Sequence, residues 1–277
     1  MKSDNNIVQK FYDNFLFKLL KDYSTGNPRT VAAIQKSLKY IPTNSTQIID
    51  IGCGIGWTSN EFARSFSSAT ILGVDLSPTL LKNAKTLFQQ KNLFFDNIDI
   101  TSEKLEFQNT FDAAILVDVY EHISISDRAT FHSSLKNILN PSGSRVILTC
   151  PSVFHQSYLR NDEPDGLQPV DEDVDLATMI KLAEDLDGEI IHFEYQDIWH
   201  SFDYLHTVIE INPQYQKGLK IRRSSKKPGL EPRIERENRI KKYYPEVVDD
   251  LIEPVTPVEV RLTKKLKNIA RNFHKPK

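Results

Sequence analysis

The chain has 277 residues, of which 39% are hydrophobic and 26% charged, and this balance is ordinary for a soluble protein with a full core. Its formal net charge of −2 excludes a global positive field that would attract nucleic acid or a membrane. Two cysteines are too few for a disulfide framework, and no apolar run reaches the length of a membrane span, so we expect a cytoplasmic protein.

Apolar residues at helical spacing open the chain. Ile7, Phe11, Phe15 and Leu19 follow one another at intervals of four, which predicts a helix. A turn-rich segment, residues 24–30, separates it from a second helix. We expect residues 1–44 to form a helical unit ahead of the main domain.

Strands and helices alternate through the next 170 or so residues. This alternation predicts an α/β fold with a mostly parallel sheet that is covered on both faces. The strands are expected near residues 47–52, 69–75, 93–98, 112–117, 144–150, 189–195 and 204–211.

The most informative motif follows the first strand, where Asp50 precedes glycines at positions 52, 54 and 56. Glycines at the end of a buried strand let the backbone turn sharply and lie close to a ligand. The dinucleotide fingerprint would need its third glycine at position 57, which is occupied by Trp57. The spacing therefore disfavours NAD or FAD.

Acidic residues follow three further strands. Asp75 lies 25 residues after Asp50, and nucleoside-binding α/β domains place a carboxylate near this position to accept hydrogen bonds from both ribose hydroxyls. A turn acid without a ligand is the alternative interpretation. Asp99 follows the third strand, with Asp96 as a competing choice, and Asp118 follows the fourth.

These motifs together resemble those of class I S-adenosylmethionine (SAM) methyltransferases. The segment FDAAILVDVYEHI, residues 111–123, is similar to one found in the branch of the ubiquinone-pathway and sugar or small-metabolite O-methyltransferases. The resemblance covers about residues 45–212. It implies a Rossmann-like, doubly wound sheet of about seven strands, mostly parallel, with an antiparallel last strand.

The resemblance also implies a cofactor, SAM, which leaves as S-adenosylhomocysteine (SAH). In such relatives an N-terminal helix closes over the cofactor, so Tyr12, Tyr23 and Arg29 are candidate lid residues. A helix that only covers one sheet face is the alternative. The cofactor-binding residues that the resemblance implies are Asp50, Gly52, Gly54, Gly56, Asp75, Leu76, Asp99, Ile100 and Asp118.

The acceptor is expected after the fourth and fifth strands, because ligands of open α/β sheets collect at the carboxyl ends of the strands. Methyl transfer to a hydroxyl needs in-line geometry and a proton acceptor. His122 is the first candidate base, since similar O-methyltransferases often carry a histidine there, and His155 is the second. A residue without a chemical role is the alternative for each. Candidate substrate residues are Tyr12, Arg160, His200 and Tyr204.

Two features of this side have open interpretations. Asp118, Glu121 and His122 could together hold a divalent cation, as some ubiquinone-pathway relatives are thought to do, but three ligands on one turn are not diagnostic and we name no metal site. The acid-rich loop 151–175 either shapes the substrate pocket or is a solvated connection. Its acids disfavour a nucleic-acid substrate.

Residues 214–277 fall outside the resemblance. The first half of this basic extension has the charge pattern of a solvated face or a flexible arm. Residues 260–275 place apolar side chains on one helical face among lysines and arginines. This stretch could dock on the domain, pair in a homodimer or touch an anionic membrane surface.

We therefore expect residues 45–213 to form a SAM-binding domain. The leading hypothesis is O-methylation of a hydroxyl on a sugar, a glycan precursor or another small metabolite. Carboxyl or nitrogen methylation of a small molecule is the first alternative. A catalytically silent SAM-binding module, whose basic arm engages a partner, is the second.

Overall fold

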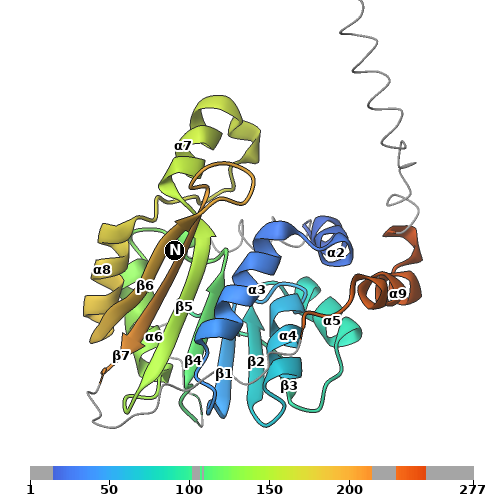
Figure 1. Ribbon diagram of the computed structural model, residues 1–277, viewed down its shortest axis with the longest axis horizontal. Helices are drawn as coiled ribbons and strands as arrows, with labels where there is room; N and C mark the ends of the chain where they lie inside the picture. The colour runs from blue at the N-terminus through green and yellow to red at the C-terminus, as the bar shows by residue number, and fades with distance from the viewer. Residues whose placement is uncertain (1–14, 102–106, 108, 214–228, 248–277) are drawn as a thin grey trace, which may run out of the picture.

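The computed structural model describes residues 15–101, 107, 109–213 and 229–247. In this part of the chain, seven strands form one sheet in the order β3-β2-β1-β4-β5-β7-β6 (Figure 1). Pairing is parallel from β3 to β5, whereas β7 runs antiparallel to both β5 and β6. The predicted doubly wound sheet with an antiparallel last strand is confirmed. The strands are β1 (Gln47–Ile51), β2 (Thr70–Asp75), β3 (Leu93–Asn97), β4 (Ala113–Val117), β5 (Ser144–Pro151), β6 (Gly188–Gln196) and β7 (Tyr204–Ile211).

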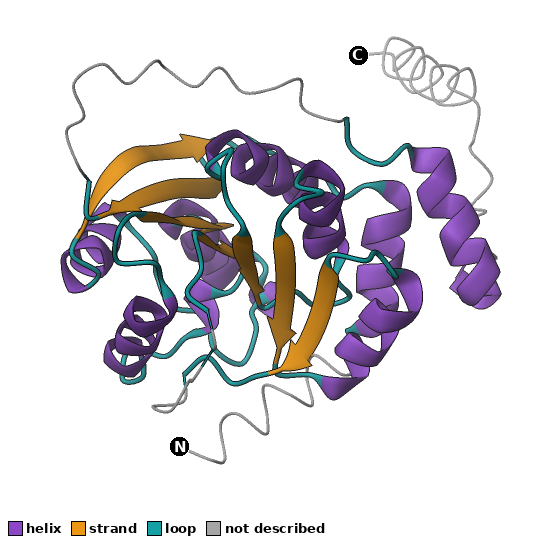
Figure 2. Ribbon diagram, turned by 90° about the horizontal axis from the view of Figure 1, so that it is seen from below, coloured by secondary structure: helices purple, strands orange, loops and turns teal. Residues whose placement is uncertain are grey.

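Helices cover both faces of the sheet (Figure 2). Successive side chains of a strand point to opposite faces, so Ile48 packs in the cluster with α3, α4 and α5, while Ile49 packs in the cluster with α6 and α8. Both faces are therefore apolar, as a parallel sheet requires. The helices are α2 (Leu16–Thr25), α3 (Pro28–Tyr40), α4 (Trp57–Ser65), α5 (Pro78–Leu87), α6 (Arg128–Ile138), α7 (Val153–Asp162), α8 (Leu176–Asp185) and α9 (Arg233–Tyr243), with short 3₁₀ turns at Tyr120–His122 and Pro164–Gly166.

Short polar side chains cap the N-termini of α5 and α3. The Ser77 hydroxyl accepts a hydrogen bond from the Leu80 amide at 3.1 Å and caps α5. Asn27 accepts one from the Arg29 amide at 3.0 Å and caps α3, directly after Gly26 has ended α2 with a positive φ of 83°. The turn between α2 and α3 is therefore defined by local chemistry.

The C-terminal segment, residues 229–247, packs on the main domain. Its helix α9 contacts α2 and α5 (Figure 1), and Ile240 is fully buried. These residues are therefore not a flexible arm, because α9 buries Arg236 and Ile240 against the domain, while most of its other side chains form a solvated face. The amphipathic stretch 260–275 lies outside the described residues.

Among the residues that the structure describes, no helix has the length and the apolar character needed to cross a membrane. Cys53 and Cys150 are both buried free thiols.

The glycine loop after β1 depends on backbone conformations that other residues rarely adopt. Gly52, Gly54 and Gly56 have φ values of 69°, 55° and 82°. A Cβ atom on Gly56 would also lie 2.6 Å from the ring of Phe95, and one on Gly52 would lie 2.4 Å from Val119. The loop is thus closely packed as well as conformationally restricted.

We expect Gly56→Ala to lower the free energy of unfolding by about 3 kcal/mol, from the left-handed φ and the clash with Phe95. Urea unfolding measures this change. Gly229→Ala is the matched control, because a Cβ there meets no atom within 4 Å, and its effect should stay within about 0.5 kcal/mol. Equal unfolding midpoints for the two variants would contradict this account of the loop.

Candidate functional site

A cleft lies at the carboxyl ends of the parallel strands. Its walls are the glycine loop, the residues that follow β2, β3 and β4, and the helix α2 with the start of α3. Predicted cofactor residues in the lining are Gly52, Gly54, Asp75, Leu76, Asp99, Ile100 and Asp118, and the predicted base His122 lines it as well.

Asp75 connects the glycine loop to the end of β2. Its carboxylate accepts a hydrogen bond from the Gly54 amide at 2.8 Å and another from the Ser77 amide at 2.9 Å. Each carboxylate oxygen has a second lone pair. Asp75 can therefore support the turn and accept hydrogen bonds from a ligand, so its two interpretations are compatible.

Asp50 does not line the cleft. It is 1% exposed and accepts hydrogen bonds from the hydroxyls of Thr58 and Ser59. Burial raises the pKa of Asp50 to about 6, although the two hydroxyls lower it. This geometry makes Asp50 a brace between β1 and the start of α4. Gly56, which is also absent from the lining, is the N-cap of α4.

Asp118 is held between two distant elements. It has a positive φ of 55°, which costs a non-glycine residue about 1 kcal/mol. Its carboxylate accepts a hydrogen bond from the Tyr204 hydroxyl and lies 3.1 Å from Nε of Arg29. The Arg29 guanidinium lies 5.6 Å from the ring centroids of both Trp199 and Tyr204. The start of α3 is thereby tied to β4 and β7.

His122 lies between carboxylates in the 3₁₀ turn after β4. Its Nδ1 is 2.7 Å from the Val170 carbonyl oxygen and 3.2 Å from Asp171, and its Nε2 is 3.6 Å from Glu121. Burial by itself lowers the pKa of His122, but Glu121, Asp171 and the carbonyl outweigh it and raise the pKa to about 9. The imidazole is therefore protonated at neutral pH.

Glu121 is a fully buried acid beside this imidazole. Neither of its carboxylate oxygens has a hydrogen-bond partner within the described part of the chain. Burial raises the pKa of Glu121, and the charge of His122 opposes that rise. The two side chains therefore form an acid–base pair at the edge of the cleft.

Comparison with known proteins finds relatives for part of the chain. Residues 48–143 match the family model described as a methyltransferase domain. Over these residues the chain is similar to methyltransferases. The ubiquinone biosynthesis O-methyltransferase of Rhodopseudomonas palustris (strain BisA53) is 30% identical over 103 residues, which are 37% of this chain and 39% of that relative. The chain thus spans about two fifths of the length of this curated relative.

Solved methyltransferases share the fold. The crystal structure of magnesium protoporphyrin IX methyltransferase from Synechocystis PCC 6803 with bound SAH has a TM-score of 0.56 at 16% identity, covering 75% of this chain and 98% of that one. A SAM-dependent methyltransferase from Anabaena variabilis ATCC 29413 has a TM-score of 0.60 at 14% identity, covering 75% and 95%. Both support the Rossmann-like class of the fold.

Of the predicted acceptor residues that the structure describes, none lines the cleft. Tyr204 is 1% exposed and bonds to Asp118, while Arg160 pairs with Asp173 in the loop 151–175. His155 and His200 flank Tyr158, with ring centroids 6.3 and 5.4 Å from its ring. Tyr12 lies outside the described residues. The acceptor-side residues therefore stay predictions.

Three charged residues that line the cleft were not predicted from the sequence. Lys18 and Asp22 of α2 face the cleft and form an ion pair of 3.0 Å, and Asp127 lines it from the start of α6. A charged pair at i and i+4 beside the apolar stripe of the N-terminal helix was the available signal. Such pairs are common on solvated helices, so the signal was weak. Within the described residues, no group of three or more potential ligands is arranged to hold a metal ion.

The environment of His122 predicts its titration. We expect its ring to lose a proton near pH 9. Asp171→Asn should lower this pKa, because one carboxylate that stabilises the imidazolium is removed. NMR titration of the ring nitrogens measures both values, with His206 as an internal reference, since burial lowers its pKa to about 4. Titration of His122 near pH 6.5 in both proteins would contradict the role of the carboxylates.

Proposed function

We propose that the protein is a SAM-dependent methyltransferase that methylates a hydroxyl of a small molecule. The observation that carries this proposal is the cleft, which brings the glycine loop, Asp75, Asp99 and His122 together although they lie at the ends of four different strands. Residues of α2 and the start of α3 close the other side of this cleft.

The lining suits SAM in particular. Gly52 and Gly54 present backbone to the cleft, and the carboxylate of Asp75, which also lines it, can accept hydrogen bonds from ribose hydroxyls. Leu76 and Ile100 offer apolar contacts to a flat base, and Asp99 lies beside them. SAM supplies a methyl group on a positively charged sulfur, which the acidic lining favours.

His122 is the proposed proton acceptor. In the transfer, the methyl–sulfur bond breaks, a methyl–oxygen bond forms, SAH leaves and the hydroxyl proton passes to a base. His122 can act as that base only after it has lost its own proton, because its pKa is raised to about 9. Glu121, at 3.6 Å, then stabilises the imidazolium that forms.

Several features support a hydroxylated small metabolite, such as a sugar or glycan precursor, as the acceptor. The cleft wall near His122 is polar, with Ser124, Asp127 and Gln168 in its lining. These side chains can hydrogen-bond to a polyhydroxylated molecule. The curated relatives named above are O-methyltransferases, which supports oxygen as the methylated atom.

A second candidate is a carboxyl or nitrogen methyltransferase. The raised pKa of His122 favours it, because an ionised carboxylate or a neutral amine reacts without a base. Variants of His122 separate this candidate from O-methylation.

Wild-type protein should bind SAM and SAH in calorimetry, and Asp75→Asn should weaken binding about tenfold to a hundredfold, through the loss of charge-assisted hydrogen bonds. Asp165→Asn is the matched control, since Asp165 is exposed in the loop 151–175, and it should bind as wild type does. Absence of SAM binding by the wild-type protein would refute the proposal.

The rate should also depend on pH through His122. We expect kcat/KM for O-methylation to rise from pH 7 to pH 9 as the imidazole loses its proton. His122→Ala should abolish this rise and lower the rate by about a hundredfold or more, while bound SAH in calorimetry reports that the domain is folded. Turnover near the wild-type level in this variant would favour the carboxyl or nitrogen acceptor.

A further inference from the structure

The helix that borders the cleft also contacts the C-terminal segment. One face of α2 lines the cleft with Lys18, Leu19 and Asp22. The neighbouring face carries Tyr23, which is fully buried and meets the Trp57 ring edge-on at 5.5 Å between centroids. Trp57 is the first residue of α4, directly after the glycine loop. Tyr23 therefore links the position of α2 to that of the loop.

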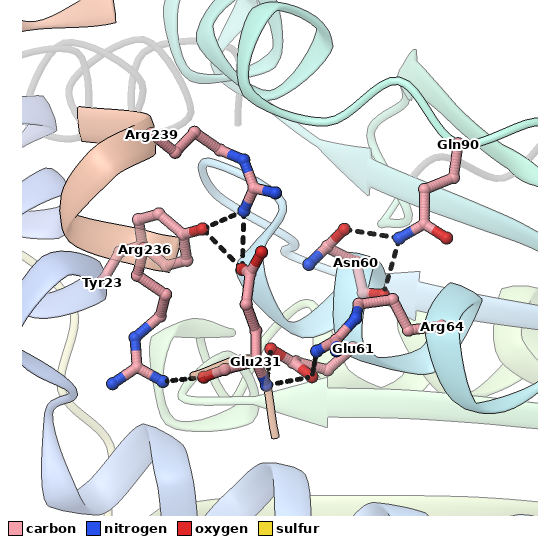
Figure 3. Close-up of polar contacts among 8 residues, drawn as sticks. All are labelled: Tyr23, Asn60, Glu61, Arg64, Gln90, Glu231, Arg236 and Arg239. Carbon is pink, nitrogen blue, oxygen red and sulfur yellow. Dashed lines mark hydrogen bonds and ion pairs between the residues drawn. The ribbon is translucent and has the colours of Figure 1, made fainter. Parts of the chain in front are cut away.

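Glu231 is a buried residue whose hydrogen bonds reach three helices (Figure 3). Its carboxylate accepts a hydrogen bond from the Tyr23 hydroxyl at 2.8 Å and one from Nη1 of Arg239 at 2.6 Å. Its backbone amide donates to the carboxylate of Glu61 at 3.3 Å. Glu231 is only 2% exposed, and a buried charge of this kind is stable only while its partners remain. The contacts tie α2, α4 and α9 together.

Arg236 lies against the turn between α2 and α3. Its Nη1 donates to the carbonyl oxygen of Glu231 at 2.8 Å (Figure 3). Its guanidinium lies 5.6 Å from the centroid of the Trp57 ring. A Cβ atom on Gly26 would be 2.7 Å from Nη2 of Arg236. One side chain of α9 thus contacts both the turn that precedes Arg29 and the residue that follows the glycine loop.

We propose that the C-terminal segment 229–247 is a positioning element for the SAM cleft, which holds α2 and the Gly26 turn in the place that binds the cofactor. Arg236 and Glu231 are the positioning residues. The inference rests on the proposed function for the identity of the ligand. Its basis in geometry is that Lys18, Leu19 and Asp22 line the cleft on the same helix whose Tyr23 bonds to Glu231.

The apparent affinity for the cofactor depends on the fraction of molecules in which α2 is in place. If α2 is in place only a fraction of the time, the apparent Kd rises by the inverse of that fraction. At saturating SAM the bound cofactor restores the correct position in every molecule. Loss of the positioning contacts therefore raises KM for SAM and the Kd of SAH, and leaves kcat unchanged.

The test compares three full-length variants with wild type. Arg236→Ala removes the contacts to Trp57 and to the Glu231 carbonyl, and Tyr23→Phe removes one hydroxyl from the Glu231 carboxylate. Arg233→Ala is the matched control, because Arg233 is exposed on the same helix and pairs with Glu237 at 2.6 Å. The measurements are hydrogen exchange of residues 16–29, calorimetry with SAH, and kcat and KM for SAM.

Arg236→Ala should increase exchange in residues 16–29. It should raise the Kd of SAH and KM for SAM about tenfold, if α2 is in place about a tenth of the time. Its kcat should stay within about twofold of wild type. Tyr23→Phe should show smaller changes in the same direction, and Arg233→Ala should match wild type.

Distinct results separate the two proposals. If wild-type protein binds no SAH, the proposed function fails, and exchange of residues 16–29 still decides whether the segment holds α2. Unchanged exchange in Arg236→Ala overturns the inference, as does increased exchange with wild-type SAH affinity. A fall in kcat at unchanged KM overturns it too. If Arg236→Ala does not fold, Tyr23→Phe carries the same comparison.

Discussion

Three hydrogen bonds hold the glycine loop against the end of β2, and the cleft depends on them. The amides of Gly52 and Cys53 donate to the Val74 carbonyl oxygen at 2.8 and 3.0 Å, and the Gly54 amide donates to Asp75 at 2.8 Å. These bonds require the positive φ values of the glycines. Because the loop is fastened to the neighbouring strand, its other side is available to a ligand.

Charged side chains around the cleft lie beside partners of opposite charge. Asp118 meets Arg29 from α3, and His122 meets Glu121 and Asp171. Buried charges persist where such partners compensate them. Glu121 and Asp171, which do not line the cleft, raise the pKa of His122 and so favour its protonated form. The carboxylates that line the cleft are different residues, among them Asp75, Asp99 and Asp118.

The cleft is completed by segments from both ends of the chain. Residues of α2 form one wall, and α9 packs on the outside of that helix. Tyr23 and Glu231 are 208 positions apart and meet in a buried hydrogen bond. The position of this wall therefore depends on the C-terminal segment that packs against it. Segment 229–247 lies outside the residues that match the family model, yet it contacts the helix that forms this wall of the cleft.

The sequence by itself determined the sheet, the glycine loop and the acids at the strand ends, because apolar periodicity is local and parallel strands bring their carboxyl ends to one edge. It could not determine which side chains enter the cleft. Asp50 and Tyr204 turned inward as supports, and the charged helix α9 docked. Only the tertiary structure decided these points, because burial and charge pairing join residues that are far apart along the chain and leave no local pattern.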